Sequence, residues 1–204
     1  MPTAPPVVPV LDVNVWTAAV GELPQRRCTD IAALLHVTPQ AARFAAQRRV
    51  VAALARRPLR YRVYSSGHVL DLIAAKLALS SADGGWGWAA EDAYDYAAAV
   101  EDLLIDTGGG VLSPPTGNRT LLVGRTDRAG ALAADPEFSR WPDDEDCYVL
   151  ALAAEVARRE GDNGRVALLL SDDRAFTGVL GRVWRSRKIG VLTSAEALNR
   201  GLVK

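Results

Sequence analysis

Short, apolar runs rich in β-branched residues alternate with longer helical stretches along this chain, and this alternation limits its fold more than any other feature. VVPVLDVNVW (Val7 to Trp16) and RVALLLSDD (Arg165 to Asp173) have the continuous apolar character of strands buried on both faces. YRVYSS (Tyr61 to Ser66) and the run from Ile189 predict two further strands. Strands separated by helices indicate an α/β fold: three layers, α/β/α, around a central, mostly parallel sheet.

Helical spacing predicts the elements between the strands. The predicted helices cover 30–37, 39–57, 68–79, 91–107 and a stretch from about Asp143. The glycines at 108–110 are expected to end the fourth of these helices, and Thr193 or Ser194 to cap a last short one. The pattern places no strand between 111 and 139. Because no repeat or linker divides the sequence, we predict a single domain over 1–204.

Composition excludes several classes of protein. Hydrophobic residues make up 49% and charged residues 24% of the chain, and 24 basic side chains balance 24 acidic ones, so a strongly basic nucleic-acid binder is not indicated. Cys28 and Cys147 are far apart, which indicates two free thiols in a reducing compartment. The first ten residues lack the basic and apolar regions of a signal peptide, so none is expected, and no apolar run has membrane-spanning length. A cytoplasmic location without membrane contact is expected.

Acidic residues follow two of the predicted strands. Asp12 comes at the end of the first strand, with Asn14 two positions on, and Asp172 and Asp173 end the strand that begins at Arg165. Ligands of open parallel sheets bind at the carboxyl ends of the strands. Asp12 has apolar neighbours on both sides, and a buried carboxylate without a partner is costly. A polar partner or a metal ion is therefore expected at Asp12.

A run of four acids opens the helix predicted from about Asp143, and helical spacing separates their roles. Glu155, the one charged residue between 147 and 157, is expected to mark the solvent face. Asp146 is nine residues earlier, about half a turn away at ~100° per residue, and shares its face with Leu150 and Ala153. Asp144 returns to the side of Glu155 and suits the helix start. Asp146 is therefore predicted to point inward.

Asp71 is a lone acid in the apolar helix predicted over 68–79. Ala74, Ala75 and Ala78 surround it at helical spacing and would allow close approach on that side. A surface role and a functional role are equally compatible with this pattern.

These motifs together resemble the PIN domain, a metal-dependent nuclease fold that includes VapC-type toxins. VLDVN, an acid in the helix after a serine-containing strand end, an Asp ahead of VLALAA, and LLLSDDRAF occur in the family's order and cover most of the chain. The chain is especially similar to PIN-like toxins in which acids precede an L-A-L-A run. By this likeness the four catalytic acids are Asp12, Asp71, Asp146 and Asp173, supported by Asn14 and Ser171.

The sequence also departs from the PIN pattern. Ala175 stands where the family often has a further acid, and Asp71 stands where Glu is more common. The regions near 21–60 and 107–139 are longer than in a minimal PIN domain. The missing acid puts a second metal ion in doubt but does not exclude the first.

The resemblance implies a Mg²⁺- or Mn²⁺-dependent endoribonuclease, with RNA as substrate and a toxin–antitoxin pair as one setting. Asp12, Asp146 and Asp173 would hold the metal, and Asp71 would orient water or complete a second metal site. An antitoxin partner and a homodimer are compatible with the family, and the sequence decides neither. Trp86 and Trp88 are candidates for base stacking or for packing of their loop. A basic cluster is the candidate RNA contact: Arg182, Arg185, Arg187 and Lys188.

Two other functions remain open on the sequence. TDIAALLHVTPQAARFA (Thr29 to Ala45) resembles the first helices of a helix-turn-helix, although His36 stands where Gly is usual. The second alternative is a PIN fold without catalysis that serves as a binding module. A haloacid-dehalogenase-like phosphatase is disfavoured because Asn14 stands where that family requires a second Asp.

Overall fold

The structure is a computed structural model, and it describes residues 6–23, 31, 35, 42–113, 144–173, 176 and 189–203, with the main chain alone at 42 and 144–147. The described strands form one five-stranded sheet in the order β3-β2-β1-β4-β5. Every pair of neighbouring strands is parallel. The bounds of the strands are β1 (Val7–Leu11), β2 (Tyr64–Ser66), β3 (Gly110–Leu112), β4 (Val166–Leu170) and β5 (Ile189–Leu192).

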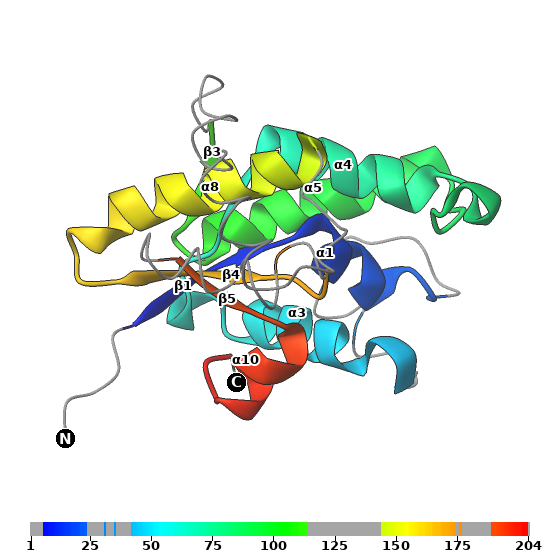
Figure 1. Cartoon of the computed structure of the whole chain (residues 1–204). Helices are drawn as coiled ribbons and strands as arrows, with labels where there is room; N and C mark the ends of the chain where they lie inside the picture. The colour runs from blue at the N-terminus through cyan, green and yellow to red at the C-terminus, as the bar shows by residue number, and fades with distance from the viewer. Residues whose placement is uncertain are drawn as a thin grey trace, which may run out of the picture.

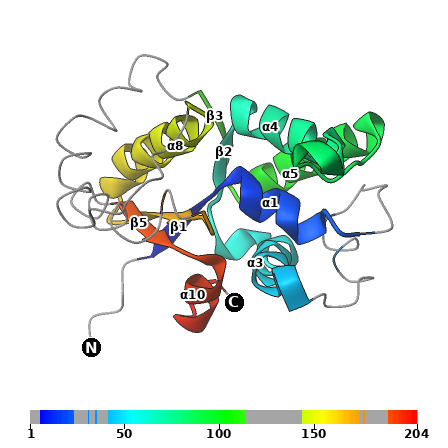
Figure 2. The same cartoon turned by 45° about the vertical axis from the view of Figure 1, so that its right-hand side comes forward.

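Helices cover both faces of this sheet, which confirms the predicted three-layer α/β/α fold. Figure 2 shows α8 on one side of the strands, and α1 and α3 on the other. The helices α4 and α5 pack against each other beside β2 and β3, and α10 packs against α3. Their bounds are α1 (Val13–Val20), α3 (Ala45–Arg56), α4 (Gly67–Ala78), α5 (Ala90–Asp106), α8 (Asp144–Gly161) and α10 (Ser194–Asn199). None of the helices in the described part of the chain has the length and apolar character needed to span a bilayer.

The strand predicted over Val7 to Trp16 is too long. β1 ends at Leu11, and the carbonyl oxygen of Asp12 accepts hydrogen bonds from the backbone N–H groups of Val15 (3.0 Å) and Trp16 (3.4 Å), which begins α1. Val15 and Trp16 are fully buried. Because α1 is enclosed on nearly all sides, its sequence is as apolar as a strand, and periodicity alone does not separate the two.

The other predicted elements agree with the structure within a few residues. α4 and α5 match the predicted helices, and α3 begins later than predicted because a turn of 3₁₀ helix, Ala42–Phe44, precedes it. Thr193 caps α10 in a capping box with Glu196, as expected of one of the two candidates. The sequence did not predict β3. The helix predicted over 30–37 and most of the segment 111–139 lie outside the described residues.

The carboxyl ends of the strands form one edge of the sheet, where several elements meet. Leu11 pairs with Leu170, so the residues after β1 and β4 emerge side by side. α4 begins directly after β2 at this edge. α8 leads into β4 and therefore runs against the strands, which brings its first turn to the same edge, beside the beginning of α4 (Figure 1). The fold therefore brings the chain segments that carry the four predicted acids to one edge of the sheet.

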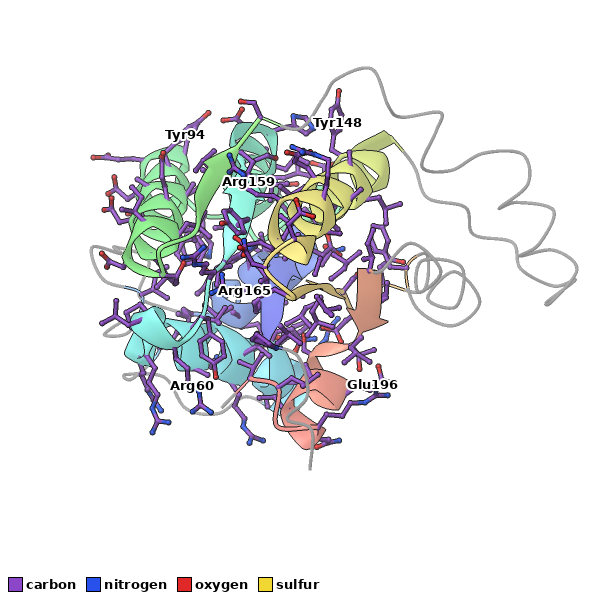
Figure 3. The ribbon with its side chains drawn as sticks, turned by 90° about the vertical axis from the view of Figure 1, so that its left-hand side faces the viewer. Arg60, Tyr94, Tyr148, Arg159, Arg165 and Glu196 are labelled. Carbon is purple, nitrogen blue, oxygen red and sulfur yellow. The ribbon has the colours of Figure 1, made fainter. Side chains whose placement is uncertain are left out.

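The amino ends of the strands carry a buried carboxylate that the sequence did not indicate. Figure 3 looks onto this edge, where Arg165 is labelled. The Glu160 side chain is 2% exposed and accepts hydrogen bonds from Tyr64 (2.6 Å) and Arg165 (2.8 Å), with Arg62 at 3.4 Å. Burial raises the pKa of Glu160, but these donors outweigh burial and lower it. Glu160 therefore stays charged and ties α8 to β2 and β4.

Candidate active site

A buried carboxylate and a buried hydroxyl from the two central strands form the centre of the candidate site. Asp12 is 2% exposed, and Ser171, which follows β4, is fully buried. The Ser171 hydroxyl donates a hydrogen bond to Oδ2 of Asp12 at 2.8 Å. The backbone N–H of Asp12 donates to the carbonyl oxygen of Leu170 at 3.0 Å, which continues the β1–β4 ladder to the site. The strand register therefore fixes the position of both side chains.

Asp173 completes this group from the loop after β4. Its backbone N–H donates to Oγ of Ser171 at 3.0 Å, so one hydroxyl connects Asp173 to Asp12. Asp173 is half-buried. Asn14 is exposed, and its amide donates to Oδ2 of Asp12 at 3.5 Å, the long limit of a hydrogen bond. Four of the residues that the resemblance selects are thus adjacent.

Burial and a second negative charge act against ionisation of Asp12. Desolvation raises the pKa of Asp12 to about 6; the hydrogen bond from Ser171 opposes this shift, and the charge of Asp173 adds to it. A carboxylate at this position is therefore costly near neutral pH unless a cation compensates it. This is the electrostatic setting in which a bound divalent ion is stabilising.

Asp172 has a different role from its neighbour Asp173. Its carboxylate accepts hydrogen bonds from the backbone N–H (3.1 Å) and the hydroxyl (2.6 Å) of Ser194, at the start of α10. It also accepts one from the Gln47 amide of α3 at 2.9 Å. Asp172 thus holds α10 and α3 to the end of β4. The sequence showed two adjacent acids and no signal that separates them.

Replacement of Asp172 by Ala is expected to lower the free energy of unfolding by about 1–2 kcal/mol, because the start of α10 loses its carboxylate partner. Chemical denaturation checks this result. Asp173→Ala is the matched control, and it should change stability less because it also removes a negative charge that crowds the buried Asp12. A larger loss of stability in Asp173→Ala than in Asp172→Ala would contradict this division of roles.

Asp71 is exposed on α4, and it follows His68, whose ring contacts α8, by one helical turn. The ring of His68, one helical turn before Asp71, contacts the ring of Tyr148 of α8, with centroids 4.0 Å apart. His68 and Asp71 are both exposed, and residues three apart share one side of a helix. Asp71 therefore lies on the same side of α4 as His68. The structure gives no contact between Asp71 and Asp12 among the residues it describes.

Asp146 belongs to the first turn of α8, and its side chain lies outside the described part of the structure. Leu150 and Ala153, whose face helical spacing assigns to it, are fully buried. Glu155 is 18% exposed and pairs with Arg158, whose side chain is 73% exposed and marks the solvent face better. The inward face predicted for this helix is confirmed at Leu150 and Ala153, and the role of Asp146 stays a prediction.

The loop tryptophans are packing residues. Trp88 is 3% exposed and donates its indole N–H to the carbonyl oxygen of Gly21 at 3.3 Å. Trp86 lies edge-on to Phe44, with ring centroids 5.4 Å apart. Of the two alternatives for this loop, packing is therefore the one that the contacts favour. The predicted basic cluster lies outside the described residues: Arg182, Arg185, Arg187 and Lys188.

The donor set of the site suits a hard cation held by few protein ligands. Within the described residues, no group of three His, Cys, Asp or Glu side chains is close enough to hold a metal ion. Asp12 and Asp173 form a pair, and Mg²⁺ commonly binds one or two carboxylates and keeps several waters. The buried, charge-crowded carboxylate of Asp12 fits such an ion.

Comparisons with known proteins give no relative for this chain: no protein-family model, no curated protein and no solved structure matches it.

Proposed function

We propose that this protein is a Mg²⁺- or Mn²⁺-dependent nuclease of the PIN type, with RNA as substrate. The observation that carries the proposal is the Asp12 carboxylate, which is buried at the carboxyl edge of the sheet, bonded by Ser171 and crowded by the charge of Asp173. A fold rarely keeps such a costly group unless it binds a cation or takes part in chemistry.

In this proposal Asp12, Asp173 and Asp146 hold the metal ion. A bound Mg²⁺ or Mn²⁺ supplies an activated water and neutralises charge on the phosphate and the leaving oxygen. The Ser171 hydroxyl orients the Asp12 carboxylate and fixes the main chain of Asp173. Asp71, from the side of α4, orients water at the mouth of the site.

A narrower form of the proposal makes the protein the toxin of a toxin–antitoxin pair that acts in the cytoplasm. The support for this setting is the resemblance to VapC-type and PIN-like toxins. An antitoxin protein or a second copy of the chain would be the partner. The alternative without catalysis, a degenerate PIN fold or a helix-turn-helix binder, shares the fold but requires no metal at Asp12.

Cleavage of single-stranded RNA in the presence of Mn²⁺ tests the proposed activity. Asp12→Asn and Asp173→Asn are each expected to lower the cleavage rate at least about 100-fold, because metal-ion stabilisation of the transition state contributes several kcal/mol. EDTA should abolish cleavage by the wild type.

Asp172→Asn is the matched control, because it neutralises an acid of the same loop that contacts Ser194 and Gln47 instead of Asp12. It should retain the wild-type rate at a temperature where it is folded. Equal rates in the wild type and Asp12→Asn, or cleavage that EDTA does not affect, would refute the metal-dependent nuclease.

A further inference from the structure

Two aromatic rings meet at the edge of the sheet that carries the candidate site. His68, in the first turn of α4, and Tyr148, near the start of α8, have ring centroids 4.0 Å apart and an interplanar angle of 50°. His68 is exposed and Tyr148 is half-buried. No motif in the sequence points to this pair, although His68 lies one turn before Asp71 and Tyr148 follows two residues after Asp146.

The surroundings of this pair differ from those of the Trp88–Tyr96 pair. Trp88 and Tyr96, which are also in contact, are both buried in the core, and each donates a side-chain hydrogen bond to a backbone carbonyl of the α1 region. The His68–Tyr148 pair instead joins α4 to α8, and His68 is exposed. It therefore presents ring surface to solvent at the edge of the sheet where Asp12 lies.

The His68–Tyr148 pair lies at the same edge of the sheet as the candidate active site. His68 and Asp71 occupy one side of α4, and the contact with Tyr148 turns that side toward α8. Asp12 and Ser171 lie at the same edge of the sheet, after β1 and β4. A polynucleotide bound along this edge of the sheet would pass both the Asp12 carboxylate and the two rings.

We propose that His68 and Tyr148 form a platform on which an unpaired base of single-stranded RNA stacks. This inference rests on the proposed function, since it names a substrate contact of the same site. Aromatic side chains bind unpaired bases through their ring faces, with little dependence on base identity. A base within a duplex is already stacked and cannot use the platform, so the site selects single-stranded segments.

Fluorescence of a single-stranded oligouridine that carries one 2-aminopurine tests the platform, with EDTA present so that no cleavage occurs. Wild-type protein should bind the oligonucleotide and quench 2-aminopurine. His68→Ala and Tyr148→Ala should each weaken binding about 5- to 100-fold and relieve the quenching, as expected for the loss of one base–ring stack. The same oligonucleotide in a duplex should be bound more weakly and without a change in quenching.

Two variants make this result specific. Tyr148→Phe keeps the ring and should bind like the wild type, whereas Tyr94→Ala removes a tyrosine that is 65% exposed on α5, away from α8 (Figure 3), and should have no effect. Circular dichroism establishes that each variant is folded. Failure of the wild type to bind or quench, or binding by folded His68→Ala and Tyr148→Ala equal to wild type, would overturn the platform. Folded Asp12→Asn should still quench the 2-aminopurine fluorescence, because the platform needs no metal ion. A variant that quenches but does not cleave therefore separates the platform from the proposed nuclease activity.

Discussion

Asp12→Asn is expected to unfold at a higher temperature than the wild type at pH 7.5 without added metal, although it should be inactive. The folded protein raises the pKa of Asp12 to about 6 from an ordinary value of 3.8. Because the folded state binds this proton more tightly, stability falls as the pH rises from about 4 to 6, and the full cost is present at pH 7.5. Asn removes the charge and with it this cost.

The expected gain is about 1–3 kcal/mol, since a shift of about two pKa units corresponds to ~3 kcal/mol and Asn weakens the hydrogen bond from Ser171. A domain of this size gains about 2–4 °C in Tm for each kcal/mol. Differential scanning calorimetry at several pH values is the measurement. The difference between the two proteins should disappear near pH 4, where Asp12 of the folded wild type is protonated.

Addition of Mn²⁺ should reverse the order of the two melting temperatures, so that the wild type unfolds at the higher one. An ion that binds the folded state at 100 times its Kd stabilises it by about 2.7 kcal/mol, and this gain belongs to the wild type alone. Asp172→Asn, the matched control, should gain stability from Mn²⁺ as the wild type does. A lower Tm for Asp12→Asn at pH 7.5 without metal would contradict the prediction, because the charged carboxylate would then stabilise the fold. Calorimetric titration that detects no Mn²⁺ binding to the wild type would favour the fold without catalysis.

The fold class was predictable from the sequence because buried parallel strands and amphipathic helices have different patterns. The meeting of Asp12 with Ser171, 159 positions later, follows from two runs that each end in polar residues, since parallel strands end at one edge. The sequence could not separate Asp172 from Asp173. Their roles depend on which of the two contacts Ser194 and Gln47, and that contact is set by tertiary packing.

The sequence pattern did not predict a short element whose formation depends on a segment distant in the chain. The strand at Gly110–Leu112 has no strand-like run of its own, and it exists because Tyr64 to Ser66 provide its partner. The sequence also did not show where β1 ends, because the buried helix α1 that follows it is as apolar as a strand. His68 and Tyr148 were not selected because helical periodicity describes one helix at a time and gives no contact between two.

The three glycines at 108–110 have different structural roles, which the sequence pattern does not separate. The sequence predicts that they end a helix, and Gly108, with a φ of 68°, does so in the left-handed conformation. Gly109 has another reason: a Cβ there would overlap the carbonyl group of Val63. The backbone N–H of Gly110 donates to that same oxygen at 3.1 Å, and the N–H of Val63 donates to Thr107 Oγ1 at 3.1 Å. Two backbone segments are thus in direct contact with no side chain between them.

Gly109→Ala is therefore expected to lower the free energy of unfolding by about 3–5 kcal/mol, because backbone on both sides cannot move aside without breaking the hydrogen bonds that pair β2 with β3. Gly161→Ala is the control: its Cβ would meet nothing within 4 Å at the end of α8, and Ala should stabilise that helix by up to about 1 kcal/mol. Urea denaturation of both variants measures the difference. Similar midpoints for Gly109→Ala and wild type would mean that the segment at Val63 relaxes freely, and that the edge of the sheet next to Ser66 and α4 does not depend on this close approach.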